Sequence, residues 1–337
     1  MATFVRTQEV EHEVGEGGAV TIRVTDADMR IRGVDGDVAS IRATYEIVAT
    51  TDAEAEETFR EVQLRIERTS GSVSAQEPDR GGFGRGRGLR GVLAGLIDGS
   101  PLTEMSIEAE VPFGCTLRAD TVSGDLSGTG LIGQQRYNTV SGDLLLTEAG
   151  GEVATNTVSG DVTLRSDSDL SLRTNAVSGD LSVVAPTFRS VRANSVSGDL
   201  ELEGAFAGGG DHRIDTVSGD LHIGLVGGAT IEIRGLSTDV ASTLPHQLRG
   251  RLDRRWMVIG DGLSQITFSS MSGDLRVAAP RRSDAASAVA RTASRPAGER
   301  AAEQASDLEV LKALERGEID VDEATRRLSG MEPGGDE

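Results

Sequence analysis

The sequence is poor in several residue types, and each shortage excludes a class of structure. Aromatic residues make up only 3% of the 337 residues, so aliphatic side chains must build the core. The single cysteine, Cys115, has no partner for an intrachain disulfide or a thiolate metal site. We therefore expect Cys115 to be a small core residue. No apolar run approaches the roughly 18 residues of a membrane-spanning helix, so we expect no transmembrane segment.

Positive charge is also scarce. There are 34 basic against 54 acidic residues, a net charge of −20, and Lys312 is the only lysine. This balance disfavours a general nucleic-acid-binding surface and binding to anionic membranes, so we expect no nucleic-acid partner. The opening residues, MATFVRTQEVEHEV, contain no basic segment followed by an apolar one. The sequence therefore predicts no secretory signal and a cytoplasmic location.

Catalytic patterns are missing as well. The four histidines show no metal-ligand spacing, and the sequence contains no GxSxG, HExxH or P-loop motif. We predict no catalytic residue, no metal, no cofactor and no enzymatic activity.

What the sequence does contain is a repeat. The tetrapeptide Val-Ser-Gly-Asp occurs six times, at steps of 18, 18, 19, 19 and 21 residues. Its aspartates are Asp125, Asp143, Asp161, Asp180, Asp199 and Asp220. Two degraded copies end at Asp239 and Asp274, and an early one occupies residues 34–38. Counting the copies gives about nine rungs.

Around each copy the residues alternate with a period of two. Asp120, Val122 and Leu126 share one parity, and Thr121, Ser123 and Asp125 share the other. The aliphatic residues on the first parity predict a core face, and the hydroxyls and carboxylates predict a solvent face. The residue two positions before each motif valine is polar and has the core parity. These residues are Asp120, Asn138, Asn156, Asn175, Asn194 and Asp215, and buried polar groups need partners, so we predict an inward asparagine ladder.

The repeat length selects the fold. It is too short for a propeller blade and lacks the helical half of a leucine-rich repeat. The sequence therefore predicts an all-β protein, a parallel β-solenoid (β-helix) with a small C-terminal α-hairpin. Stability would come from stacking, and the ends would need caps. Residues 1–279 form the predicted solenoid, and Thr51 with Glu54 predicts a short helix within it.

Two stretches differ from the strands. Residues 69–103 are rich in glycine and arginine, which predicts a flexible insertion. Residues 280–305 form a predicted linker, and residues 306–330 a helical hairpin with a capping box at Ser306 and Glu309. The hairpin's predicted partner-binding residues are Leu308, Leu311, Leu314, Ile319 and Leu328.

These motifs carry a family resemblance. The repeated TVSGDL, preceded by MSIEAEVPFGCTLRAD, resembles the bacterial "putative adhesin" family of β-strand-repeat proteins of unknown function, which is related to the head GIN autotransporter-adhesin domain. The terminal DLEVLKALERGEIDVDEATRRL resembles a short helix-turn-helix oligomerisation module attached to such domains in envelope-stress proteins. The resemblance implies a β-solenoid and assigns no catalytic residue.

Several functions stay open. Two interpretations of the repeated aspartates remain: they share divalent cations, or they form hydrogen bonds with the backbone at a bend. Outward Thr and Ser hydroxyls fit either a polysaccharide or plain solvation. Three interpretations of the Gly/Arg-rich insertion remain: a solvated loop, an RNA-binding segment, or a segment that docks on the protein's own acidic face. A polysaccharide-active enzyme would need clustered acids in a cleft.

Our hypothesis is a non-enzymatic scaffold or adhesin-like interaction protein. It would present a repetitive acidic, hydroxyl-rich face and bind a protein partner or a second copy through the hairpin. A carbohydrate- or cation-binding module is the alternative.

Overall fold

A computed structural model describes residues 2–15, 17–78, 103–235, 237–251 and 254–281. The chain divides into two units, residues 1–281 and residues 282–337. The second unit, with the predicted hairpin and nearly all of the predicted linker, lies outside the described residues. Within the described ranges, no helix has the length and apolar character needed to cross a membrane.

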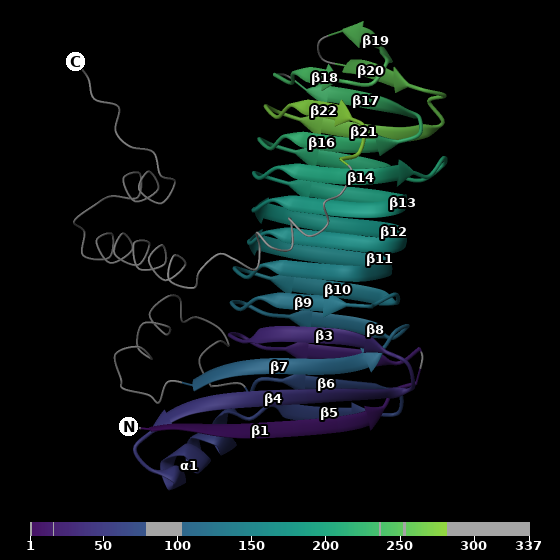
Figure 1. The fold of residues 1–337 in the computed structure, drawn as a ribbon. Helices are drawn as coiled ribbons and strands as arrows, with labels where there is room; N and C mark the ends of the chain where they lie inside the picture. Colours follow the sequence, from purple (N-terminus) through teal and green to yellow (C-terminus); the bar gives the residue numbers. More distant parts are fainter. Residues whose placement is uncertain (1, 16, 79–102, 236, 252–253, 282–337) are drawn as a thin grey trace, which may run out of the picture. The chain divides into compact units, whose positions relative to one another are not determined.

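The first unit is a stack of coils, each made of two strands joined at a tight corner (Figure 1). Equivalent strands of successive coils pair in parallel and in register, so Asn138 lies opposite Asn156 and Asn156 opposite Asn175. The predicted parallel stacking of the repeats is therefore confirmed, and the chain is built mainly of β-strands. The two strands of each coil belong to two different sheets, which face each other across the core.

The first sheet carries one strand of every coil. In spatial order it contains β5 (Arg65–Thr69), β6 (Ser72–Gln76), β2 (Ala19–Arg23), β8 (Thr116–Asp120), β10 (Gln134–Thr139), the second halves of β11 (Leu144–Ser159), β12 (Val162–Ser178) and β13 (Leu181–Ser195), then β15 (His212–Thr216), β21 (Ser264–Ser270), β17 (Ala229–Gly235), β20 (Arg254–Ile259) and β19 (His246–Arg251).

The second sheet carries the other strand of each coil. In order it contains β1 (Ala2–Glu13), β4 (Val38–Ala49), β7 (Thr103–Pro112), β3 (Asp28–Val34), β9 (Leu126–Thr129), the first halves of β11 to β13, then β14 (Leu200–Phe206), β16 (Leu221–Val226), β22 (Leu275–Ala278) and β18 (Val240–Ser242). Because β11, β12 and β13 run through both sheets, the hydrogen-bonded network is continuous over 22 strands.

At both ends the spatial order of the coils differs from their order in the chain. The coil of β21 and β22 lies between that of β15 and β16 and that of β17 and β18. The coil of β2 and β3 likewise lies between that of β6 and β7 and that of β8 and β9. The long step from Asp220 to Asp274 in the sequence is therefore a single step in space.

Antiparallel elements cover both ends of the stack, as a solenoid with exposed edges requires. β1 and β4 pair antiparallel at one end, and β19 and β20 at the other. The helix α1 (Asp52–Val62) lies at the β1 end (Figure 1). Thr51 is its N-cap and accepts a hydrogen bond from the Glu54 backbone N–H at 3.2 Å, so the helix expected from these two residues is confirmed.

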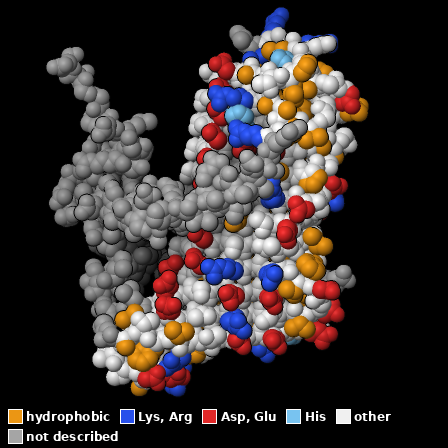
Figure 2. Space-filling model, in the orientation of Figure 1, with side chains coloured by type: hydrophobic (Ala, Val, Ile, Leu, Met, Phe, Trp, Pro, Cys, Tyr) orange, Lys and Arg blue, Asp and Glu red, His pale blue; other side chains and the backbone are white. Residues whose placement is uncertain are grey.

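The space between the two sheets is filled by aliphatic side chains, with few rings among them. Tyr45, Tyr137, Phe188 and Phe268 are fully buried there. Figure 2 shows one outer face, where acidic and basic side chains are intermixed. The core thus has the aliphatic character that the composition required.

Two sequence expectations about the N-terminal region need correction. Residues 72–76, which we placed in the flexible insertion, form β6 and pair in parallel with β2. The early motif copy at residues 34–38 does not start a rung. These residues connect β3 to β4, and β4 pairs antiparallel with β1 and β7. The same residue types therefore form a different kind of turn there.

Candidate functional site

Each Val-Ser-Gly-Asp motif forms the corner between the two strands of a coil, and its aspartate bonds to the next coil. The Oδ1 atom of each aspartate accepts the backbone N–H of the following aspartate, with N···O distances from 2.8 to 3.1 Å. In spatial order this aspartate column contains Asp28, Asp125, Asp143, Asp161, Asp180, Asp199, Asp220, Asp274 and Asp239.

The aspartate column thus links coils to one another. One oxygen of each linking carboxylate already accepts an N–H, which leaves few ligands for a cation that prefers six to eight oxygens. Among the residues that the structure describes, no group of three or more His, Cys, Asp or Glu side chains is arranged to hold a metal ion. This geometry fits the backbone-bonding interpretation of the aspartates, with the partner in the next coil.

The motif glycine allows the corners to nest. A Cβ atom on Gly160 would lie 2.4 Å from the Gly142 carbonyl oxygen, and one on Gly219 would lie 2.0 Å from the Gly198 oxygen. At Gly179 the backbone also has a φ of +113°, which side-chain-bearing residues rarely adopt. Close approach is therefore the common reason for glycine, and a positive φ is an additional one in some coils.

The inward and outward positions around the corner differ from our expectation. Thr121, Thr139 and Thr157 are buried, whereas the motif valines are 41 to 48% exposed. The exposed valines are Val122, Val140, Val158, Val177, Val196 and Val217. The error arose because we carried the period of two through the Ser-Gly-Asp corner, where the strand is interrupted and the alternation changes phase.

The motif serines bond to the neighbouring coil. The Ser141 hydroxyl donates to the Val122 carbonyl at 3.3 Å, and Ser159 donates to Val140 at the same distance. The expected outward array of Thr and Ser hydroxyls is therefore not a free face, because its threonines lie inside and its serines bond to backbone.

The asparagines form a ladder, but on the outer surface of the first sheet instead of in the core. Asn156 Nδ2 donates to Asn138 Oδ1 at 2.7 Å, and Asn175 donates to Asn156 at 2.8 Å. Asn194 continues the row by donating to Asn175 at 2.9 Å, and Asn138 donates to Asp120. Asp215 lies in register with Asn194 but pairs with Arg213 at 2.6 Å.

Beside the ladder runs a column that sequence reasoning missed. Arg118, Arg136, Ala154, Arg173, Arg192 and Arg213 lie opposite one another on successive strands of the first sheet. The signal was present, since five of the six ladder residues have an arginine two positions before them. We overlooked it because we treated the arginine-rich composition as a bias without function.

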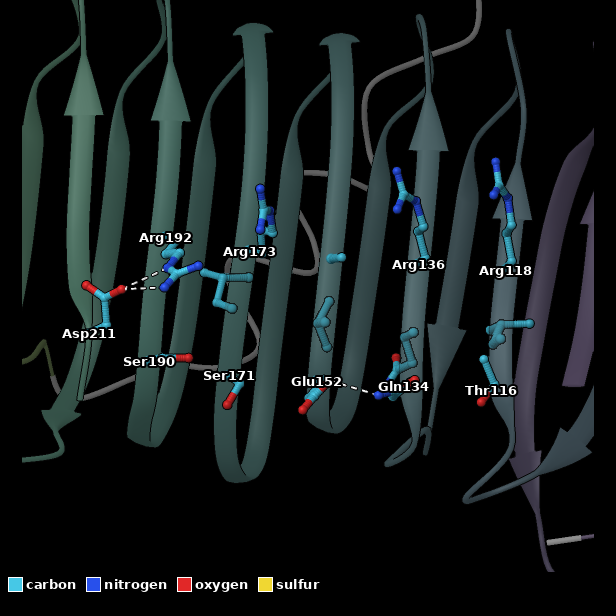
Figure 3. A pocket seen from close by; sticks show the side chains of 15 residues that line it. Thr116, Arg118, Gln134, Arg136, Glu152, Ser171, Arg173, Ser190, Arg192 and Asp211 are labelled. Atoms are coloured by element: carbon cyan, nitrogen blue, oxygen red, sulfur yellow. Dashed lines mark hydrogen bonds and ion pairs between the residues drawn. The ribbon is translucent and has the colours of Figure 1, made fainter. Parts of the chain in front are cut away.

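The column borders an open groove that we call the arginine groove, defined by Arg118, Arg136, Ala154, Arg173 and Arg192. Its volume is about 600 Å³, within the range of ligand sites. Figure 3 shows the four arginines in a line across the strands, with one strand between Arg136 and Arg173, above a row of polar side chains. That row contains Thr116, Gln134, Glu152, Ser171 and Ser190.

The four arginines of the groove have different partners. Arg118 Nε lies 2.8 Å from Asp120 Oδ2, and Arg192 lies 2.6 Å from Asp211 Oδ2. Within the described residues, neither Arg136 nor Arg173 forms an ion pair or a side-chain hydrogen bond (Figure 3). These two guanidinium groups flank Ala154, whose small side chain leaves the space between them open.

Other titratable groups of interest are buried in the core. Burial raises the pKa of the Cys115 thiol to about 11, and Cys115 is only 2% exposed. The expectation of a small core cysteine is therefore confirmed. Burial also lowers the pKa of His212, whose Nε2 lies 3.0 Å from the Ala207 carbonyl. The five predicted partner-binding residues of the hairpin, Leu308 to Leu328, lie outside the described residues.

Comparison with known proteins places the chain within one family. The model of the family described as Toastrack DUF4097 matches residues 3–278, which is most of the chain. Comparison with curated proteins found no match.

Three similar solved structures differ widely in sequence. A "putative cell adhesion protein" from Clostridium sporogenes is 7% identical, with 81% of this chain and 99% of that chain covered and a TM-score of 0.25. A "putative lipid binding protein" from Parabacteroides distasonis is 11% identical, with coverages of 80% and 96% and a TM-score of 0.32. A "putative adhesin" from Bacteroides fragilis is 10% identical, with coverages of 81% and 97% and a TM-score of 0.28. At such TM-scores the likeness carries no argument about this chain.

Proposed function

Since the chain belongs to the Toastrack DUF4097 family, we propose that it is a non-enzymatic interaction protein. In this proposal the coil stack is a stiff platform, the outer face of the first sheet binds a partner, and the C-terminal hairpin joins the protein to another protein or to a second copy. The binding face differs from the acidic, hydroxyl-rich one expected from sequence, because it carries arginines and amides.

One observation carries this proposal: the unbroken aspartate column from Asp28 to Asp239. Each carboxylate fixes the position of the next coil, so the outward side chains repeat at the strand spacing of about 4.8 Å. A platform of this kind holds many identical weak contacts in a fixed line. Several weak contacts made together give a strong combined interaction.

A carbohydrate-binding module is the second candidate. The arginine groove supports it, because hydroxyls, amides and guanidinium groups lie together in an open site of about 600 Å³. A divalent-cation module receives less support, because the aspartate column uses its carboxylates between coils.

Assembly through the hairpin is tested by changing its predicted apolar residues in the full chain. We expect Leu311→Asp with Leu314→Asp to convert an oligomer into a monomer, because a charge on the apolar face opposes its burial. Light scattering coupled to size-exclusion chromatography measures the mass. Ala286→Asp with Ala288→Asp, in the predicted linker, adds the same charge and serves as the control.

The assembly proposal has a clear counter-result. If the wild-type chain and both double variants are all monomers, and none captures a partner through the hairpin, the assembly part of the proposal is wrong. Adding calcium to the same runs tests the cation alternative, which predicts a change in mass or in elution volume.

A further inference from the structure

The arginine groove concentrates positive charge on a strongly acidic protein. Four arginines, against Glu152 and Asp211, line the groove of a chain whose net charge is −20. From Arg118 to Arg192 the column crosses four strand steps, a span of roughly 19 Å along the stack. The groove therefore follows the long axis of the coils.

Fold stability does not explain this column. Like charges on neighbouring strands repel one another, and Arg118 lies directly opposite Arg136, as Arg173 does opposite Arg192. Some arginines elsewhere on the surface are neutralised by a neighbour, as Arg213 is by Asp215. Arg136 and Arg173 lack such a carboxylate among the described residues, although the chain has a large excess of acids.

The groove thus offers two unneutralised guanidinium groups on either side of the recess at Ala154. They lie two strand steps apart, roughly 10 Å. A guanidinium group binds carboxylate or sulfate with two parallel hydrogen bonds, and these are stronger than bonds between neutral groups. The two arginines would therefore hold two anionic groups of one extended ligand that lie roughly 10 Å apart.

We propose that the arginine groove binds an anionic polysaccharide that lies across the strands, parallel to the stack. This inference deepens the proposed function and rests on its claim that the outer face of the first sheet is a binding surface. Arg136 and Arg173 bind the anionic groups. The row from Thr116 to Ser190 supplies hydroxyl and amide partners for sugar hydroxyls.

The lining favours a polysaccharide over a nucleic acid. None of the 15 described residues that line the groove is aromatic, and single-stranded nucleic acids are held largely by stacking on aromatic rings.

The test measures binding of fluorescein-labelled oligogalacturonate, which is carboxylated, to the full chain by fluorescence anisotropy at low salt. Heparin oligosaccharides provide a sulfated probe, and a neutral dextran oligomer and a dT20 oligonucleotide are run beside them. We expect Arg136→Ala with Arg173→Ala to weaken binding roughly tenfold or more, with a shallower salt dependence. Arg30→Ala with Arg32→Ala, on β3 of the second sheet, removes the same charge outside the groove and should leave binding unchanged.

Ala154→Glu separates ligand binding from folding. Its carboxylate would lie opposite both free arginines, so we expect an unchanged or higher melting temperature together with a loss of probe binding. A purely structural role for Arg136 and Arg173 predicts no such loss.

The probes decide between the possible outcomes. Binding of oligogalacturonate, of heparin or of both, with loss in the two groove variants, supports the proposal and identifies carboxylate or sulfate as the recognised group. The proposal is overturned if neither anionic sugar binds, if the groove variants bind as the wild type does, or if dT20 binds most tightly. Equal binding of neutral dextran to wild type and groove variants would overturn the inference while leaving the outer face as a binding surface.

Discussion

At the scale of single residues, Asp161 shows how one side chain serves the whole repeat. Its Oδ1 accepts the Asp180 backbone N–H at 2.8 Å, and its own N–H donates to Asp143 Oδ1 at 3.0 Å. The bond to the next coil needs an oxygen acceptor and does not need a negative charge. The charge even opposes stacking, because neighbouring aspartates in the column repel one another.

Asparagine and alanine at position 161 should therefore behave differently. Asp161→Asn keeps an acceptor oxygen and removes repulsion, so we expect little change or a small gain in the free energy of unfolding. Asp161→Ala leaves the Asp180 N–H without this acceptor and should cost about 1–2 kcal/mol. Urea denaturation measures both, and an equal loss in the two variants would show that the charge itself is required.

His212 gives the protein a dependence on pH. The side chain is buried at the start of β15, its ring meets Phe206 edge to face at 5.1 Å, and Nδ1 has no hydrogen-bond partner among the described residues. Burial lowers the pKa of His212 below its ordinary 6.5, so the folded protein holds this ring neutral. At pH values below about 6.5 the unfolded chain therefore binds more protons at this histidine than the folded chain does.

We therefore expect the free energy of unfolding to fall as the pH drops below about 6.5. His212→Asn should reduce this fall, because the residue at position 212 then no longer titrates. Urea denaturation at a series of pH values between 5 and 8 measures it. His246→Asn, which changes an exposed histidine, is the matched control, and an identical pH profile in both variants would contradict the assignment.

At the scale of the element, the corner determines which side chains face the core. Thr155 and Thr174 are each 1% exposed, and the Thr155 hydroxyl donates to the Thr174 hydroxyl at 2.7 Å. Val158, in the same strand, is 46% exposed. An uninterrupted alternation through the corner places Val158 inside and Thr155 outside, which is the reverse.

Two substitutions of nearly equal volume distinguish these arrangements. Thr155→Val removes a buried hydrogen bond and should lower the free energy of unfolding by about 1–2 kcal/mol. Val158→Thr exchanges one exposed β-branched residue for another and should change it by less than about 0.5 kcal/mol. Chemical denaturation measures the free energy of unfolding of both variants. A larger loss for Val158→Thr than for Thr155→Val would support the uninterrupted alternation instead.

At the scale of the whole molecule, the repeat predicted that the coils stack. It did not predict which side chains face outward or how the coils are ordered at the ends of the stack. Parallel coils followed from the spacing of Asp125, Asp143 and Asp161, because a fixed period requires equivalent positions to stack. The outward position of Asn138 could not be read from a strand pattern, since it depends on where Gly142 interrupts the strand.

The binding face required three-dimensional register. Arg136 and Arg173 are 37 residues apart in sequence, and only the pairing of β10, β11 and β12 places them on either side of Ala154. The inserted coils at the ends were equally invisible, because sequence order carries no sign that β21 lies between β15 and β17. Periodicity thus predicts which coils are adjacent where the repeat is regular. It does not predict adjacent coils where the chain returns to insert a coil between two others.

The inserted coil of β21 and β22 also determines how the molecule carries mechanical load. The last described strand is bonded on both sides, to β16 and to β18, and the chain leaves the stack three residues after it, at Arg281. A pull applied through the segment beyond Arg281 therefore acts on an interior coil and must shear two rows of backbone hydrogen bonds together. A solenoid whose last coil is also its outermost would instead peel open along a single row. The fold thus attaches its C-terminal segment at a point that resists tension.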